Sequence, residues 1–257
     1  MAALKDKCVA VSKINSSYAN GYVTKMAHLT LLDISLNMEI LRTTFSDQCE
    51  DGFSSLTYHD HVDWIYGNET VLNDEGLCTF AGSHYDPGYA CGPTGHSNCT
   101  KYGIPGSSAL LHTTYYTGNY TCNPEIYKSF PYSCHVGDIT GKFGAFLVPN
   151  PSNKTIRFIR VLYDPYSAQT CNAGSLFKSA VMHCNSGFRL FCWPWSLSKG
   201  IRPKMEFLEN VINTLWWIDQ KQSSLQEHFD VDAYINIDTN TLLKSLKQNA
   251  YYVAKSI

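Results

Sequence analysis

Residues 56–63 read LTYHDHVD and place His59 and His61 two positions apart, between Tyr58 and Val62. Side chains two positions apart on a β-strand point to the same face of a sheet, so both imidazoles can contact the same ligand. A metal ion is one such ligand. Two histidines on a solvated strand face are the alternative, and the pair alone does not decide between the two interpretations.

The first 200 residues otherwise favour an all-β fold. Short runs rich in Val, Ile, Tyr, Phe and Thr are separated by Gly, Pro, Asn and Ser, as expected for strands joined by turns. These runs cover residues 8–14, 21–26, 154–164, 179–184 and 188–193. Several short strands with frequent turn signals predict an antiparallel sandwich or barrel for residues 1–200.

Residues 82–144 have the composition of a long loop, rich in Gly, Pro, Asn, Tyr and Cys. Loops of this length in a compact domain are usually functional or disordered. Four cysteines lie in the loop, at Cys91, Cys99, Cys122 and Cys134. We expect them to pair among themselves and give the loop a fixed shape, with three connectivities left open.

The last part of the chain, residues 201–257, has a different pattern. After Pro203, apolar residues recur at helical spacing, at Met205, Leu208, Val211, Ile212, Leu215 and Ile218. Residues 230–238 alternate as an edge strand would, and a second helical pattern follows residue 240. The sequence therefore predicts a C-terminal α-helical extension, whose role it does not indicate.

Charge and cysteine content narrow the classes of function. The 257 residues carry a formal net charge of −2, which argues against nucleic acid or an anionic membrane as partner. No apolar run reaches the roughly 18 to 20 residues needed to span a bilayer. Ten cysteines fit an oxidising compartment. Five N-x-S/T acceptors, at Asn15, Asn68, Asn98, Asn119 and Asn153, also favour an extracellular protein.

The amino terminus does not fit that compartment. It reads MAALKDK, and its charges interrupt the segment before the apolar region of a signal peptide forms. We therefore expect either a shortened chain or an incomplete gene model.

Further histidines occur in short, distinctive motifs. His84 follows Cys78 and precedes Pro87, in the pattern C-x5-H-x2-P. His135 and Asp138 form H-V-G-D at the end of the long loop. His183 closes an apolar run and is followed by Arg189 and Cys192, in the pattern H-x5-R-x2-C. Each motif has an ordinary structural interpretation when it is taken alone.

Taken together and in this order, the motifs resemble the copper/zinc superoxide dismutase family, from about Cys8 to Cys192. The resemblance is closest to a secreted, copper-only branch that lacks the electrostatic loop, because the His183-to-Arg189 spacing leaves no room for it. It implies a Greek-key β-barrel or sandwich. It also implies superoxide as a small-molecule substrate, which is converted to oxygen and hydrogen peroxide. The oligomeric state is not predicted.

The family's site residues carry over by motif. The four copper ligands correspond to His59, His61, His84 and His183, and His84 corresponds to the histidine that bridges copper and zinc. His135 and Asp138 correspond to zinc ligands, Arg189 to the arginine that draws in the anion, and Cys78 with Cys192 to the intrasubunit disulfide.

The chemistry of copper suits these residue types. Imidazoles are suitable copper ligands, and four nitrogens give the tetragonal geometry of Cu(II). By the family's mechanism, His84 takes a proton that is later delivered to peroxide. Arg189 offers a permanent charge and a fork of donors to a small anion. A non-enzymatic copper-binding or adhesive extracellular module is the alternative function.

The sequence leaves alternatives open for the zinc site and for the residues that surround the copper. A full zinc site needs a further histidine shortly after His84, and the nearest is His96. Zinc held in part by His135 and Asp138 is one interpretation, and hydrogen bonds from these two residues that orient His84 are the other. Asp60 is expected to face away from the metal, because side chains alternate along a strand.

Overall fold

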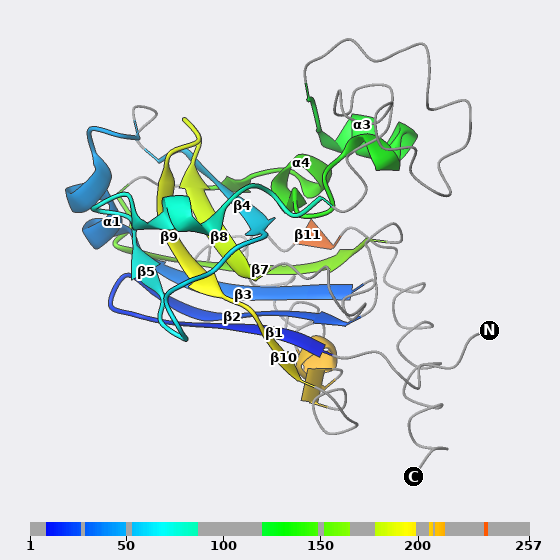
Figure 1. The fold of residues 1–257 in the computed structure, drawn as a ribbon, viewed down its shortest axis with the longest axis horizontal. Coiled ribbons are helices and arrows are strands. Elements are labelled where there is room, and N and C mark those ends of the chain that lie inside the picture. Colours follow the sequence, from blue (N-terminus) through cyan, green and yellow to red (C-terminus); the bar gives the residue numbers. More distant parts are fainter. Residues whose placement is uncertain are drawn as a thin grey trace.

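Two β-sheets face each other in the computed structural model (Figure 1), which describes a subset of the 257 residues. The described residues are 9–26, 29–49, 53–86, 120–148, 152–164, 178–198, 206–207, 209–213 and 234–235. Among them no helix is long and apolar enough to cross a membrane.

The first sheet has six strands in the order β10-β1-β2-β3-β7-β11. Their bounds are Ser196–Ser198, Val9–Asn15, Ala19–Met26, Leu29–Asn37, Thr155–Tyr163 and Tyr234–Ile235. All pairs are antiparallel except β11, which runs parallel to β7 at the edge. The edge strand expected within residues 230–238 is therefore present.

The second sheet has five strands in the order β5-β9-β8-β4-β6, all antiparallel. Their bounds are Val71–Leu72, Arg189–Pro194, Ser179–Cys184, Ser55–His61 and Phe146–Leu147. The two histidine-bearing strands lie side by side, with Thr57 opposite His183 and His59 opposite Val181. The prediction of a mostly β, antiparallel sandwich is confirmed.

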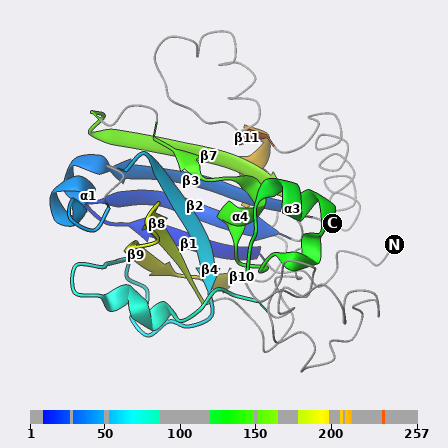
Figure 2. The same ribbon diagram turned by 90° about the horizontal axis from the view of Figure 1, so that it is seen from above.

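Short helices close the ends of the sandwich. Figure 2 shows α1 (Met38–Phe45) at one end and α3 (Pro124–Ser129) with α4 (Ile139–Phe143) at the other. Each is capped at its start by a side-chain oxygen, of Asn37, Asn123 and Asp138 respectively, which accepts a backbone N–H of the first turn. Two 3₁₀ turns, η2 (Leu77–Ala81) and η4 (Pro131–Ser133), lie in the connections. The cap of α4 matters most here, because Asp138 belongs to the candidate site.

The main core lies between the two sheets. It includes Leu32 and Phe158 from the first sheet and Tyr58, Met182 and Trp193 from the second, all buried. Because strand side chains alternate, Tyr58 faces this core while His59 and His61 face the opposite side of the second sheet. That outer face is covered by the segment around Cys78 and Ala81, which packs on Val181 and Cys192.

Part of the C-terminal extension packs on the outer face of the six-stranded sheet. Residues 206, 207 and 209–213 are helical, and Phe207 and Val211 are buried against Leu31 and Val161. The other predicted helical residues lie outside the described part of the chain. The boundary near residue 200 between a β domain and a helical extension stays a prediction.

Three disulfides occur among the described residues, and no described cysteine is free: Cys49–Cys184, Cys78–Cys192 and Cys122–Cys134. The second is the pair that the motif resemblance implied, and the third lies within the expected loop set. Cys91 and Cys99 lie outside the described residues, so the rest of that connectivity stays a prediction.

Candidate metal centre

Four imidazole rings from three separate parts of the chain meet on the outer face of the second sheet. The centroid of the His59 ring lies 4.1 Å from that of His84, 4.8 Å from that of His183 and 6.4 Å from that of His61. His61 in turn lies 5.0 Å from His84 and 5.8 Å from His183. The structure thus brings together the four rings that the sequence motifs singled out.

Backbone carbonyls orient two of these rings. Nδ1 of His61 is 2.9 Å from the carbonyl oxygen of Gly82, and Nδ1 of His183 is 3.1 Å from that of Gly187. A carbonyl only accepts, so each Nδ1 carries the proton and each Nε2 is left as a lone-pair donor. Gly187 reaches His183 because the β8–β9 turn is tight, with a positive φ of 85° at this glycine.

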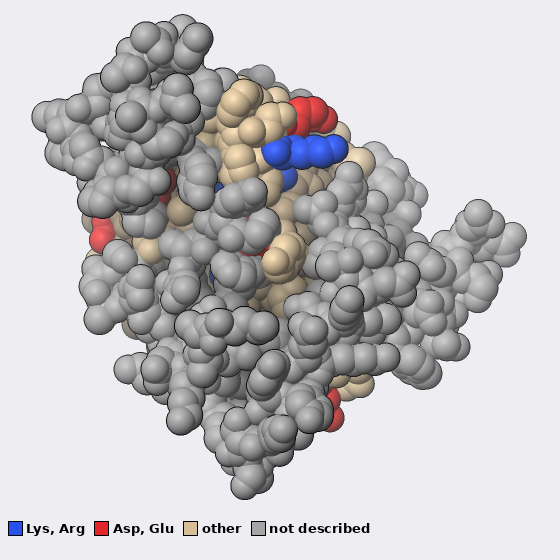
Figure 3. All heavy atoms as spheres, turned by 90° about the vertical axis from the view of Figure 1, so that its right-hand side faces the viewer, with Lys and Arg blue, Asp and Glu red and all other residues tan. Residues whose placement is uncertain are grey.

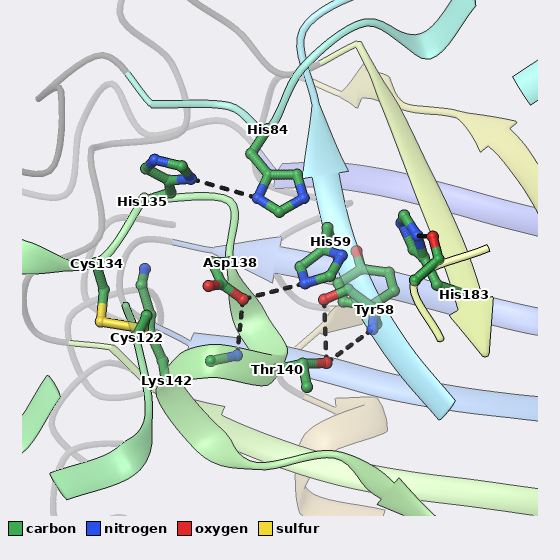
Figure 4. A network of polar contacts seen from close by, with 12 residues as sticks. Tyr58, His59, His84, Cys122, Cys134, His135, Asp138, Thr140, Lys142 and His183 are labelled. Atoms are coloured by element: carbon green, nitrogen blue, oxygen red, sulfur yellow. Dashed lines mark hydrogen bonds and ion pairs between the residues drawn. A yellow bond between two sulfur atoms is a disulfide. The ribbon is translucent and has the colours of Figure 1, made fainter. Parts of the chain in front are cut away.

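Asp138 orients the third ring. Its Oδ1 lies 3.1 Å from Nε2 of His59 and accepts the Gly141 N–H at 2.7 Å, while its Oδ2 accepts the Tyr120 hydroxyl at 2.6 Å. Burial alone would raise the pKa of Asp138, but the hydrogen bonds from His59 and Tyr120 outweigh it and lower the pKa. The carboxylate therefore stays ionised and turns Nδ1 of His59 toward the other rings (Figure 4).

These constraints leave three imidazole nitrogens facing one another without hydrogen bonds. Nδ1 of His59 and Nε2 of both His61 and His183 are buried and have no partner among the described residues. The ligand atoms of these three residues all lie within 4.8 Å of one another. A buried imidazole nitrogen without a partner is costly, and a metal ion at their centre would satisfy all three at once.

Burial keeps three of the four rings, those of His61, His84 and His183, in the neutral form that binds metal. Desolvation lowers the pKa of His61 to about 3 and that of His84 to about 2, and it also lowers the pKa of His183. The neighbouring imidazoles lower these values further. At neutral pH the imidazoles of His61, His84 and His183 are therefore uncharged nitrogen donors.

His84 is held differently from the other three. Nδ1 of His84 is 3.3 Å from Nδ1 of His135, and the two rings meet edge to face (Figure 4). The His135 ring stacks on Tyr120 with centroids 3.7 Å apart, and its Nε2 lies 3.7 Å from a carboxylate oxygen of Asp86. His84 sits in a connecting segment joined to β4 by one isolated bridge at His61. Its ring is thus tied less directly to a sheet than those of His59 and His183.

Arg189 lies at the edge of the cluster. Its guanidinium donates to the carbonyl oxygens of Cys78 and Gly82, the second at 2.8 Å. The Gly82 carbonyl is the one that orients His61, so the guanidinium and that ring share an acceptor. The Cys78–Cys192 disulfide fixes the segment carrying these carbonyls to β9, the strand that begins at Arg189.

The contacts of the zinc-related residues His135 and Asp138 agree with the sequence prediction only in part. His135 contacts His84, as the hydrogen-bonding interpretation expected, but the imidazole that Asp138 hydrogen-bonds is that of His59 rather than His84. Ligand atoms of His59, His84 and Asp138 also lie within 4.8 Å of one another. His96 lies outside the described residues. Tyr120, which contacts both Asp138 and His135, was missed, because a tyrosine in a loop-like segment carries no signal of its own.

Comparison with known proteins gave one set of distant matches. No family model and no curated protein matches the chain. Among solved structures the chain is similar to superoxide dismutase 5 of Candida albicans in its Cu(II) form. That likeness has 15% identity and a TM-score of 0.41, and it covers 76% of this chain and 94% of that one. A variant of the same protein gives 16% identity and a TM-score of 0.41, over 76% of this chain and 92% of that one. With identity this low, the chemistry of the site must be derived from its own side chains.

Proposed function

We propose that this protein is a copper-dependent superoxide dismutase of an extracellular, oxidising compartment. The reaction converts two superoxide anions and two protons to one oxygen and one hydrogen peroxide. The observation that supports it most is the set of three buried imidazole nitrogens without partners, on His59, His61 and His183, with the Arg189 guanidinium at their edge. The three disulfides of the described residues support the compartment.

The donor set fits copper. Imidazole nitrogens suit copper, and three of them stand on the rigid framework of β4 and β8. We assign Nδ1 of His59 and Nε2 of His61 and His183 as ligands, with His84 completing the set. When bound, copper would supply the one-electron oxidation and reduction that dismutation requires.

Arg189 gives the site its affinity for an anion. The molecule carries a net charge of −2, so it does not attract superoxide as a whole. On the face shown in Figure 3, a described basic side chain lies directly beside an acidic one near the upper edge. The guanidinium, half-buried and held by two carbonyls, therefore provides the local attraction and the hydrogen-bond donors for superoxide.

His84 is the residue that we assign to proton transfer. Peroxide formation consumes two protons, and a neutral imidazole can hold one at the nitrogen that faces the cluster. His84 lies in a connecting segment and its other nitrogen contacts His135. It is therefore better placed to move than the strand-borne histidines. The second proton comes from solvent.

We propose copper as the functional metal and give zinc no step in the reaction. A zinc ion near His84 would need Nδ1 of His84, Nδ1 of His135 and an oxygen of Asp138 as ligands. Both Asp138 oxygens already accept hydrogen bonds, from Gly141 and Tyr120 as well as His59. Elemental analysis of the purified protein reports both metals at once.

Superoxide consumption by copper-loaded protein tests the proposal. We expect catalytic decay of superoxide at micromolar protein, lost in His59→Ala because copper itself is lost. Arg157→Ala is the matched control for the variant Arg189→Ala. Arg157 pairs with Asp33 on the first sheet, so its substitution should leave the rate unchanged. A copper-loaded sample that does not consume superoxide would instead support the non-enzymatic copper-binding module.

A further inference from the structure

Asp60 stands between His59 and His61 on β4 and points the other way. It faces the space between the two sheets and is only 1% exposed, as the alternation of the strand predicted. An ionised carboxylate in a protein interior is costly unless charge and hydrogen bonds compensate it. Hydrogen-bond donors and a positive charge are therefore expected around the Asp60 carboxylate, and the structure has both.

Three side chains converge on the Asp60 carboxylate. The Tyr58 hydroxyl donates to Oδ1 at 2.7 Å, and the indole N–H of Trp195 donates to the same oxygen at 3.2 Å. Lys25 forms an ion pair with Oδ2, and its ammonium lies 5.5 Å from the centre of the Trp195 ring. Lys25 belongs to β2 in the first sheet, so this ion pair joins the two sheets directly behind the histidine strand.

Both backbone polar groups of Asp60 are also hydrogen-bonded. Its N–H donates to the Gly137 carbonyl at 2.9 Å, and its carbonyl accepts the Tyr85 N–H at 2.8 Å. The Gly137 N–H in turn donates to the Tyr85 carbonyl at 2.7 Å, which closes a triangle of three peptide groups.

Each corner of this triangle is adjacent in sequence to a residue of the metal centre. Asp60 is flanked by His59 and His61, Tyr85 follows His84, and Gly137 precedes Asp138. A shift of Asp60 would therefore move the three segments that carry His59 with His61, His84, and Asp138.

We propose that Asp60 and Lys25 form an inter-sheet anchor that positions the imidazoles of His59 and His61 for copper. The inference rests on the proposed function for the identity of the metal, but the anchor itself is a property of the metal-free chain. Asp60 touches neither substrate nor metal, so it is a positioning residue. It acts by holding the β4 backbone, and with it the peptide triangle, at a fixed distance from the first sheet.

The experiment compares Asp60→Asn and Lys25→Met with Lys25→Arg, which keeps the charge, and with Asp33→Asn as control. Asp33 forms a two-bond ion pair with Arg157 on the first sheet and contacts no metal-centre residue among the described interactions. The first readout is made without metal, from two-bond ¹H–¹⁵N correlation spectra of the imidazoles. The second is the copper dissociation constant with the electron paramagnetic resonance spectrum of the Cu(II) form.

We expect Asp60→Asn and Lys25→Met to shift or split the resonances of His59 and His61 in the metal-free protein. They should also weaken copper binding by about 10- to 100-fold and alter the Cu(II) spectrum. Lys25→Arg and Asp33→Asn should resemble the wild type. Should the single variants not fold, Lys25→Met combined with Asp60→Val removes both charges together and is expected to show the same spectral changes.

Folded variants with unchanged imidazole resonances and an unchanged Cu(II) spectrum would overturn the proposal, even if they unfold more easily, because the pair would then be structural only. Failure of the wild type to bind copper would overturn the proposed function instead. The metal-free spectra would still decide whether the anchor positions the rings.

Discussion

Acidification of the metal-free protein should lower its free energy of unfolding by a defined amount, because His61, His84 and His183 are buried in the neutral form. The pKa of His61 in the folded chain is lowered to about 3 and that of His84 to about 2, against about 6.5 in an unfolded chain. Below pH 6.5 these two imidazoles bind protons in the unfolded chain but not in the folded chain. Stability is therefore fully present above pH 6.5 and is lost as the pH falls toward the folded values.

The size of the loss in unfolding free energy follows from the difference between the pH and the pKa of the imidazole in the unfolded chain. At about pH 5 each of the two rings is still neutral when folded and protonated when unfolded, which amounts to about 2 kcal/mol per ring. The two contributions add to about 4 kcal/mol, because at this pH neither folded ring is charged and the two do not repel. His183, whose pKa is also lowered by burial, acts in the same direction.

Urea unfolding at about pH 7.5 and about pH 5, in the presence of a chelator, measures this loss. Carboxylates contribute little in this window, because their unfolded pKa values lie near 4 and they remain ionised in both states. His61→Gln removes one titrating ring and should reduce the difference by about 2 kcal/mol. A wild-type difference below about 1 kcal/mol would refute the reasoning, since it would mean that these rings are not held neutral in the fold.

Three further predictions concern the structure around the cluster. Arg189→Ala should retain copper but lose about 10- to 1000-fold in the rate of superoxide consumption, as measured by pulse radiolysis, and loss of copper would contradict its assigned role. Gly137→Ala should lower the free energy of unfolding by about 1–3 kcal/mol in urea titrations, because the added Cβ would lie 2.4 Å from the Asp60 carbonyl oxygen; an unchanged midpoint would contradict this. Replacing Cys78 and Cys192 together by serine should cost about 2–5 kcal/mol in the same assay, because their disulfide spans 114 residues, and a loss below about 1 kcal/mol would count against it.

Much of the β framework could be predicted because its strands are local patterns. The runs at 8–14, 154–164 and 179–184 are β-branched or aromatic and flanked by turn residues, and all three are strands in the structure. The strand Leu29–Asn37 was not singled out, although it is central to the first sheet. Its first four residues are all buried because both faces of the sheet are covered there, so the two-residue alternation that marks a half-buried strand is absent.

The site could be predicted where it depends on residue identity and not where it depends on tertiary distance. The spacing in LTYHDHVD fixes the relation of His59 to His61, but nothing local fixes the distance of either from Asp138. Asp138 bonds His59 because α4, which Asp138 caps, docks on β4 through Thr140, whose hydroxyl accepts the Tyr58 N–H at 2.7 Å. Contacts of this kind join segments some 80 positions apart, and no sequence period records them.

The convergence of His59, His61, His84 and His183 on one copper ion is tested most directly by electron paramagnetic resonance of the protein loaded with one equivalent of Cu(II). We predict a single tetragonal species whose nitrogen hyperfine pattern reports three to four imidazole ligands, with at least one lost in His183→Ala. A spectrum of oxygen-coordinated or heterogeneous copper, unchanged by that substitution, would contradict it.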